Sequence, residues 1–509
     1  MIDFTLPSIA YPAISPLLIL FGAGCLGVLV EAFLPARLRY PVQLGLALAA
    51  IAAALVAVVA LAGTTEVTAG GSVTVDGPAL FLQGALLIFG LVAMLLIGER
   101  RVEPGGPFVA QAAITAGSPA DQRQLTAPGA TEVFPLAMFS LGGMALFIAA
   151  SDLLTMFIAL EVLSLPLYLM CGLARRHRLI SQEAAVKYFL LGAYASGFFL
   201  FGLVLAYGYA GSVDLAEINA AVETSAMHPA LLYAGLALIV MGLLFKAAAA
   251  PFHVWAPDVY QGAPTPITGF MAACTKVAAF GALLRVTYVG FEPLARDWLP
   301  VLGTIAVLTM LVGAVLAVTQ TDLKRLLAYS SVANVGFVLV GLLAVNRAGA
   351  STAMFYLVAY GFAVLGAFAV ISLVRDRDGE ASHMSRWVGL GRSSPVVAGV
   401  FTLVMLALAG IPLTAGFTAK FAVFSAALGA GEVWLVIAGV VSSLIIAFPY
   451  LRVVVMMWLS EPSESTARVI APGVLTGTAL AIGAVATVGL GVAPGPVLDL
   501  AHNAAQSFG

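Results

Sequence analysis

The stretch LFKAAAAPFHVWAPDVYQGAPTP (244–266) places a charged amine beside a proline, inside an apolar run long enough to cross a bilayer. Lys246 precedes Pro251 by five residues, and His253 follows two residues later. A lysine at the centre of a membrane helix costs roughly 2.5–3.5 kcal/mol, and a proline kinks or breaks the helix. Because a broken helix frees backbone groups that need polar partners, the stretch predicts a hydrated polar site within a membrane.

Other ionisable side chains extend this pattern into neighbouring apolar runs. The lysines predicted to lie within spans are Lys187, Lys246, Lys276 and Lys420, and Glu161 adds a carboxylate. Such residues usually face a bundle interior or a water-filled cavity and mark ion or proton paths. Burial disfavours the ammonium form of a lysine and a nearby carboxylate favours it, so an amine under both influences can bind and release protons near neutral pH. The pattern therefore predicts proton translocation through these side chains.

Plain structural roles compete with this interpretation at several positions. Lys187 lies close to a predicted cytoplasmic helix end, where its amine can extend to the interface. His253 can relay protons or serve as a hydrogen-bonded structural histidine. Asp258 is predicted to be a local helix cap rather than a proton carrier, and Trp255 and Tyr260 are predicted to anchor helices at the interface.

The composition restricts the class of protein. The chain has 509 residues, of which 61% are hydrophobic and 9% charged, with a mean hydropathy of +1.06. Soluble domains are roughly 45–50% apolar and about 25% charged, so this chain is an all-α polytopic membrane protein. The net charge of −2 gives no indication of nucleic-acid binding, and the three cysteines are too far apart for a metal site.

Fourteen transmembrane helices are predicted. They cover residues 15–34, 41–62, 79–98, 133–150, 153–173, 185–209, 229–250, 264–288, 299–319, 324–345, 351–374, 395–428, 432–458 and 469–492. The twelfth contains a second interruption, LALAGIPLTAGFTAKF, where Pro412 precedes Lys420. Interrupted helices at corresponding places in two halves indicate the ion site of a transporter.

The spans suggest four parts. Residues 1–132 hold three helices and a flexible loop (99–132), and residues 133–290 form a first half of helices 4–8. Residues 291–460 form a second half of helices 9–13, and residues 461–509 hold helix 14. With alternating helices and an outer N-terminus, sixteen of the 23 basic residues fall at cytoplasmic ends. Positive charge marks the cytoplasmic side, so both termini are expected on the outer side.

Several long motifs resemble one family. FKAAAAPFHVWAPDVYQGAPTPITGF is similar to the core motif of the antiporter-like membrane subunits of respiratory complex I. EAAVKYFLLGAYASGFFLFG, TDLKRLLAYSSVANVGFVLVGL and LAGIPLTAGFTAKF also match, in the family's order, between about residues 150 and 455. The resemblance is greatest to the N-type subunits of the bacterial proton-translocating NADH–quinone oxidoreductases.

The resemblance implies a fold and a set of site residues. It implies fourteen helices in two inverted five-helix halves, with helix 7 broken at Pro251 and helix 12 at Pro412. It also implies a Glu161–Lys246 pair, followed by Lys276 and Lys420, and it matches Lys187 to a further intramembrane lysine.

One position departs from the family pattern. In YSSVANVGF the family often carries histidine where this chain has Asn334. Without a histidine relay there, water or direct transfer from Lys276 to Lys420 has to bridge the gap.

The resemblance also implies a non-redox subunit of an H⁺-translocating NADH:quinone oxidoreductase, a translocase of the bacterial cytoplasmic membrane. The complex would use NADH, FMN, iron–sulfur clusters and a quinone, none of them bound by this chain. Partners would be the lipid bilayer, other membrane subunits and, through them, a peripheral redox arm.

Three alternatives stay open. A multisubunit Na⁺/H⁺ antiporter or a membrane-bound hydrogenase has related subunits, but these tend to carry histidine in helix 8 where this chain has Lys276. An independent transporter of a small solute would work without large partners. A structural spacer would pump nothing.

Overall fold

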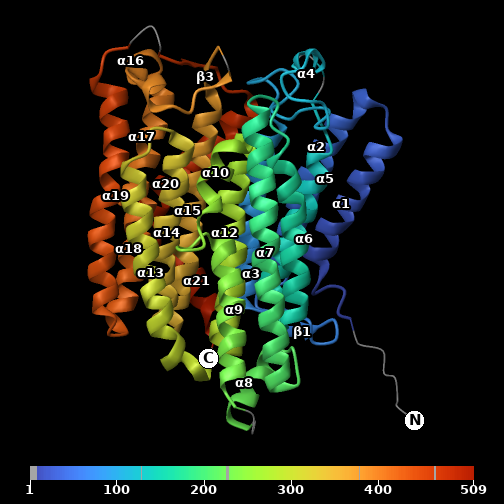
Figure 1. Cartoon of the computed structure of the whole chain (residues 1–509), viewed down its shortest axis with the longest axis vertical. Helices are drawn as coiled ribbons and strands as arrows, with labels where there is room; N and C mark the ends of the chain where they lie inside the picture. The colour runs from blue at the N-terminus through green and yellow to red at the C-terminus, as the bar shows by residue number, and fades with distance from the viewer. Residues whose placement is uncertain are drawn as a thin grey trace.

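The computed structural model describes residues 9–125, 127, 129–224, 228–377, 379–462 and 466–508. Most of the described chain is helical, and the long helices run side by side along one axis (Figure 1). The structure confirms the all-α polytopic fold.

The N-terminal part supplies three long helices. They are α1 (Ser15–Phe33), α2 (Ala36–Ala60) and α3 (Gly77–Gly98), with a ribbon of β1 (Glu66–Thr68) and β2 (Val73–Val75) before α3. The side chain of Asp76 accepts the Ala79 N–H at 2.9 Å and so caps α3. Such a cap satisfies a backbone donor that the first turn leaves free.

The next group of helices contains the first interruption. Its elements are α5 (Val133–Ala149), α6 (Leu153–Cys171), α7 (Arg178–Ala210), α8 (Leu215–Thr224), α9 (Ala230–Ala247), α10 (Trp255–Gly262), α11 (Thr265–Phe270), π-helix η1 (Met271–Thr275), α12 (Lys276–Arg285) and π-helix η2 (Val286–Gly290). The last four form one continuous helical segment, Thr265–Gly290, in which every residue except Tyr288 and Val289 is buried.

The following group contains the second interruption. Its elements are η3 (Glu292–Leu294), α13 (Ala295–Val318), α14 (Leu323–Leu342), α15 (Arg347–Leu373), η4 (Met384–Trp387), α16 (Leu390–Ser393), α17 (Pro395–Ala409), α18 (Ala415–Gly429) and α19 (Val433–Leu459). The chain ends in α20 (Val474–Val492), α21 (Gly495–Ala504) and η5 (Ala505–Ser507). The short strands β3 (Val374–Asp376), β4 (Gly379–Glu380) and β5 (Arg468–Val469) form an antiparallel sheet in the order β4-β3-β5.

The structure accounts for all fourteen predicted spans. Among the described residues, twelve helical segments are long and apolar enough to cross a membrane. Helix α5 is one residue shorter than the 18-residue length of the shortest of them. Helices α17 and α18 together make up the twelfth predicted span, 395–428.

Both predicted helix interruptions are present. Helix α9 ends at Ala247, and the chain turns through Ala248, which has a φ of 65°, before α10 begins. Helix α17 ends at Ala409 and is followed by Gly410, with a φ of 88°, and α18 begins after Leu413, with a φ of 70°. Each break exposes the carbonyl end of a half-helix inside the bundle, because the last carbonyls of a helix have no partner within it.

The segment between α3 and α5 packs against the bundle and is not a free loop. It contains the short helix α4 (Pro119–Gln124), capped by Ser118. Arg175 donates to the carbonyl oxygen of Pro104 at 2.6 Å, and Arg178 pairs with Asp121 at 2.5 Å. Arginines of the α6–α7 turn and of α7 thus hold the segment against the bundle, and its flexibility stays a prediction.

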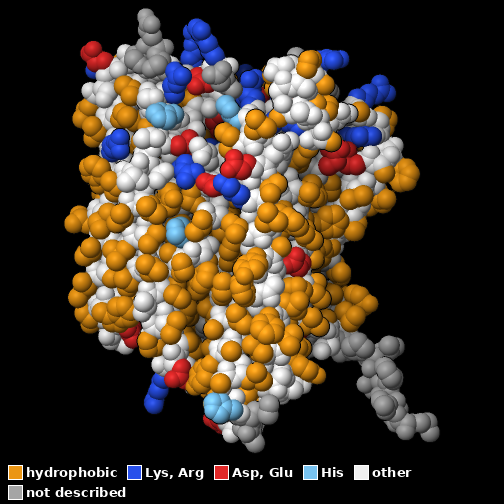
Figure 2. Space-filling view, viewed as in Figure 1, with side chains coloured by type: hydrophobic (Ala, Val, Ile, Leu, Met, Phe, Trp, Pro, Cys, Tyr) orange, Lys and Arg blue, Asp and Glu red, His pale blue; other side chains and the backbone are white. Residues whose placement is uncertain are grey.

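The two ends of the molecule differ in charge. Lys and Arg side chains gather at the end that carries α4, α16 and β3, and hydrophobic side chains cover most of the flank between the ends (Figures 1 and 2). At the opposite end, Ala10 N–H donates to the hydroxyl of Thr68 and the Phe508 ring packs on Tyr288. The chain therefore starts and finishes at the less basic end.

Candidate proton-transfer site

Lys246 is buried at the end of the first half-helix. Its side chain lies in the last turn of α9, and the residue is 2% exposed. The Nζ atom donates to the Ser164 hydroxyl at 2.7 Å and to the Tyr188 hydroxyl at 3.1 Å. The rings of Tyr168 and Tyr188 lie 5.5 and 5.1 Å from the amine, within the range of a cation–π contact. Hydroxyls and aromatic faces thus surround this amine.

Glu161 does not pair directly with Lys246. It lies on α6 one turn before Ser164, and the described residues include no ion pair between it and Lys246. One of its carboxylate oxygens, Oε1, is buried and has no hydrogen-bond partner. The expected direct pair is therefore replaced by an indirect arrangement. The Lys246 amine binds the Ser164 hydroxyl, which lies one turn of α6 after Glu161.

The aromatic residues after the first break belong to this site. Trp255 and Tyr260 are each 1% exposed. The Trp255 ring stacks on Tyr188 at 4.5 Å, and its indole N–H donates to the carbonyl oxygen of Phe245. Their prediction as interface anchors is wrong, because α10 turns them into the bundle, where Trp255 packs on the tyrosine that holds Lys246 and Tyr260 packs against Phe368.

Lys276 lies on the carbonyl end of α9. It begins α12 directly after the π-helix η1 and is 2% exposed. Its Nζ atom donates to the carbonyl oxygen of Ala247 at 2.7 Å, the last residue of α9. The carbonyl end of a helix carries partial negative charge, so it favours an ammonium group.

Lys420 repeats this arrangement at the second break. Its Nζ atom donates to the carbonyl oxygens of Leu408 and Ala409 at 3.1 and 3.0 Å, in the last turn of α17. The Ser443 hydroxyl accepts a third hydrogen bond at 2.9 Å, and the Phe337 ring lies 4.9 Å away. At both breaks, the last carbonyl oxygens of the first half-helix thus accept hydrogen bonds from a buried lysine amine.

Asn334 lies beside Lys420 within a polar network. Its amide donates to the carbonyl oxygen of Ser330 at 2.8 Å and accepts from the Tyr356 hydroxyl at 2.7 Å. Asn334, Tyr356, Tyr360 and Lys420 share the wall of a cavity of about 10 Å³. That is about the least space that holds one water molecule. The hydroxyl of Tyr360 has no hydrogen-bond partner, so a water there would find polar groups to bind.

Lys187 and Asp258 form a separate, partly exposed cluster. The Lys187 side chain is 41% exposed and pairs with Glu183 at 2.6 Å and with Asp258 at 2.7 Å. Asp258 also binds Arg325 of α14 at 2.6 Å. The prediction of Asp258 as a local cap is wrong, because its carboxylate joins α10 to α7 and α14. Lys187 is a support for this joint rather than a member of the buried row.

His253 lies in the first break. It is 9% exposed, its Nδ1 atom is buried without a hydrogen-bond partner, and its ring centre is 6.3 Å from that of Tyr329. The geometry gives it no contact with any of the buried lysines among the described residues.

Sequence reasoning missed the groups that hold the amines. Ser164 and Tyr188 precede Lys246 by 82 and 58 residues, and Ser443 lies on the helix that follows the one carrying Lys420. Of the three, Ser164 could have been suggested by the sequence, because it lies one helical turn after the predicted site residue Glu161. Among the described residues, no group of three or more His, Cys, Asp or Glu side chains is placed to bind a metal ion.

A bundle of apolar helices with two internal breaks, each closed by a buried lysine, defines an antiporter-like membrane protein. Residues 150–446 match the family model described as NADH:quinone oxidoreductase/Mrp antiporter, TM. The NADH-quinone oxidoreductase subunit N of Salinispora arenicola is 66% identical, over 99% of both chains. The subunit N of Rhodococcus opacus is 57% identical, over 99% of this chain and 97% of that one. The chain belongs to the NADH-quinone oxidoreductase subunit N family.

Solved structures agree with this assignment. A chain of respiratory complex I from Thermus thermophilus matches with a TM-score of 0.76 and 32% identity, over 95% of this chain and 98% of that one. A chain of the Mrp complex from Dietzia sp. matches with a TM-score of 0.82 and 22% identity, over 98% of both. At that identity the second match shows the shared fold alone, so the Na⁺/H⁺ antiporter remains the more distant alternative.

Proposed function

We propose that this chain is a proton-translocating membrane-arm subunit of an NADH–quinone oxidoreductase and that Lys246, Lys276 and Lys420 carry the protons. The observation that supports the proposal most strongly is the environment of these amines. All three are at most 6% exposed, and the lysine ion pairs among the described residues involve Lys187 and Lys324 instead. Among the described residues, the hydrogen-bond acceptors of each of these three amines are carbonyl and hydroxyl oxygens.

Such an environment suits proton transfer. Without a carboxylate partner, the charged form of a buried amine depends on a few acceptors and on local hydration. A change in either alters the balance between ammonium and amine. A charge arriving at one lysine also repels the next, so a proton that enters the row promotes release further along.

The energy for transfer would come from partner subunits. Moving one charge against 100 mV needs about 2.3 kcal/mol. An electrostatic push on Glu161, whose Oε1 atom is buried without a partner, would reach Lys246 through the Ser164 turn of α6. This chain then acts as the non-redox, translocase part of the enzyme.

The proposal places this chain in a bacterial cytoplasmic membrane, with both termini on the outer side. Its partners would be other membrane subunits and, through them, the redox arm. NADH, FMN, iron–sulfur clusters and quinone would be bound there rather than by this chain, which has no role with nucleic acid. The gathering of Lys and Arg at the end opposite the termini supports this orientation (Figure 2).

Substitutions in the assembled complex test the proposal. Lys246→Ala and Glu161→Gln should lower NADH-driven proton pumping in reconstituted vesicles, compared at equal flavin content. Lys187→Ala is the matched control, because that lysine is partly exposed and outside the row. Full pumping by Lys246→Ala would instead favour a structural spacer.

A further inference from the structure

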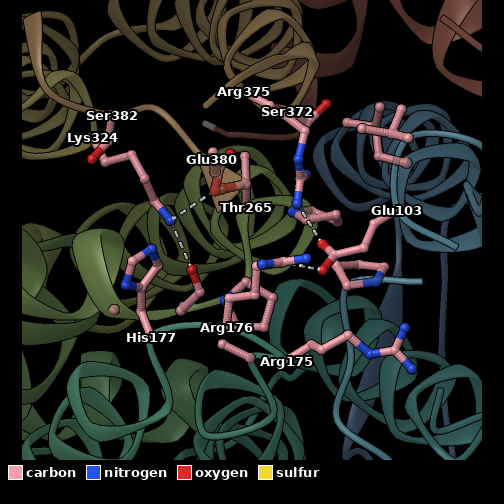
Figure 3. Close-up of a pocket in the computed structure, with 18 of the residues that line it drawn as sticks. Glu103, Arg175, Arg176, His177, Thr265, Lys324, Ser372, Arg375, Glu380 and Ser382 are labelled. Carbon is pink, nitrogen blue, oxygen red and sulfur yellow. Dashed lines mark hydrogen bonds and ion pairs between the residues drawn. The ribbon is translucent and has the colours of Figure 1, made fainter. Parts of the chain in front are cut away.

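A second cavity lies at the basic end of the molecule. It has a volume of about 190 Å³ and is lined by the α6–α7 turn, the α10–α11 junction, the start of α14 and strands β3 and β4 (Figure 3). This is many times the roughly 10–15 Å³ that one water molecule needs, so the cavity has room for several. His177 in its wall is exposed and Lys324 is 4% exposed, so the cavity reaches from the surface to a buried amine.

Lys324 lines this cavity, and its amine contacts the carbonyl end of a helix, as the amines of Lys276 and Lys420 do at the helix breaks. Its Nζ atom donates to the carbonyl oxygen of Ala263 at 2.8 Å, directly after the end of α10. A third buried amine therefore rests on the carbonyl end of a half-helix, and this one faces a cavity that reaches the surface.

Glu380 is the carboxylate beside that amine. Its Oε2 atom accepts from the Thr265 hydroxyl at 2.6 Å and lies 3.9 Å from Lys324 Nζ, whereas its Oε1 atom is buried without a partner. Figure 3 shows Lys324, Thr265 and Glu380 grouped together, apart from the ion pairs of Glu103.

The other carboxylates of the cavity wall are already bound. Glu103 pairs with Arg176 at 2.9 Å and Arg375 at 2.6 Å. Glu99 accepts from the backbone N–H groups of Arg101 and Thr476. Of the carboxylates lining the cavity, Glu380 is therefore the one with an oxygen that has no hydrogen-bond partner among the described residues.

Polar groups lead from Lys324 along α14 into the bundle. Ser331 and Asn334 follow it by seven and ten residues, which places Asn334 about 15 Å further along the helix. The Tyr260 hydroxyl lies 3.3 Å from the Ser331 hydroxyl. Asn334 in turn shares the small cavity of Lys420.

We propose that the cavity of Lys324 and Glu380 is a proton-uptake site that supplies Lys420 along the polar side of α14. This inference rests on the proposed function. A hydrated proton in the cavity protonates the carboxylate of Glu380. The carboxyl group passes that proton to the neutral amine of Lys324, after the amine has released its own toward Ser331. Each step moves one proton between oxygen and nitrogen atoms, with no change of oxidation state.

Substitutions at the uptake site form the first test, in the full complex reconstituted into vesicles. Glu380→Gln and Lys324→Gln should lower the initial rate of NADH-driven proton pumping at equal flavin content. Glu380→Asp and Lys324→Arg should restore much of it, because each keeps the charge. Unchanged pumping by Glu380→Gln overturns the inference. If Lys246→Ala then still loses pumping, the proposed function stands without this uptake site.

Blocking the cavity provides a second test that does not depend on removing Lys324. Ser372 lines the cavity and its hydroxyl bonds only within α15. Ser372→Cys would be labelled with a charged thiol reagent in a Cys25→Ser background, because Cys25 is the exposed native cysteine. Ser393→Cys, exposed on α16 and outside the cavity wall, is the matched control.

The labelling result decides between two outcomes. Complete labelling at position 372 should lower pumping, while complete labelling at position 393 should leave it unchanged. Equal pumping after both labels contradicts proton uptake through the cavity, even if a Lys324 variant fails to assemble.

Discussion

At the residue scale, Ser164 gives Lys246 a hydroxyl acceptor that a neighbouring serine does not provide. Ser164→Ala removes the 2.7 Å hydrogen bond to the amine. A hydrogen bond to a charged group contributes about 1.5–3 kcal/mol, so pumping should fall, though less than on loss of Lys246 itself. Ser140→Ala is the control, since its hydroxyl donates to the carbonyl oxygen of Leu163. Equal pumping by both variants would show that Ser164 does not act through the amine.

The acceptors of Lys420 allow a similarly matched comparison. Ser443→Ala removes one of three hydrogen bonds to the amine, while the neighbouring Ser442 hydroxyl is buried without a partner. Ser443→Ala should slow NADH-driven pumping, and Ser442→Ala should pump as the unmodified complex does. A defect shared by both variants would point to packing of α19 rather than to the amine.

At the element scale, the turn of the second break holds Lys420 in position. Gly410→Ala would place a methyl group 3.1 Å from Lys420 Cδ, at a φ of 88° that alanine rarely adopts. The left-handed conformation costs roughly 1–2 kcal/mol. Gly431 has a similar φ of 87°, but a methyl group there would have no atom within 4 Å. Gly431→Ala therefore has only the free-energy cost of the left-handed backbone conformation. Gly410→Ala should therefore lose pumping and Gly431→Ala should keep it, when both are measured at equal flavin content.

A buried ion pair fixes α3 against α12. Arg285 binds Asp76 at 2.8 Å and also donates to the carbonyl oxygen of Ile148. Removing one partner of a buried pair costs about 3–5 kcal/mol, whereas an exposed pair contributes about 0–1 kcal/mol. Arg285→Met should therefore lower the thermal stability of the purified complex far more than Lys187→Met does. Similar stability losses would mean that the burial of the Arg285 pair does not matter.

The helix interruptions could be predicted from sequence because their causes are local. Pro251 and Pro412 act on their own helices, and the apolar runs on either side are long enough to show the spans. The partners of Asp258 and Trp255 could not be predicted in this way. They depend on how α10 re-enters the bundle after the break, which only the packing of α7 and α14 determines.

At the scale of the whole molecule, the segment between α3 and α5 covers the basic end through Asp121. Burial raises the pKa of Asp121, but the Gly117 N–H and the Arg178 guanidinium outweigh it and hold the pKa below the ordinary value of 3.8. A lowered pKa contributes stability that is present above about pH 3.8 and lost as the pH falls through the folded value.

Limited proteolysis measures how firmly this segment is attached. Asp121→Asn should increase cleavage within residues 99–132 at neutral pH, because it removes the charged partner of Arg178. Gln122→Ala, at an exposed neighbouring position, is the control. Equal cleavage of the two variants would contradict a role for Asp121 in attachment.

Lys276 tests the central claim most directly, because the acceptor of its amine among the described residues is the carbonyl oxygen that ends α9. The measurement is the initial rate of NADH-driven proton pumping by the complex with Lys276→Met, at equal flavin content. The account predicts that pumping falls sharply while the redox centres remain in place. Pumping at the unmodified rate would contradict a row of proton-carrying amines.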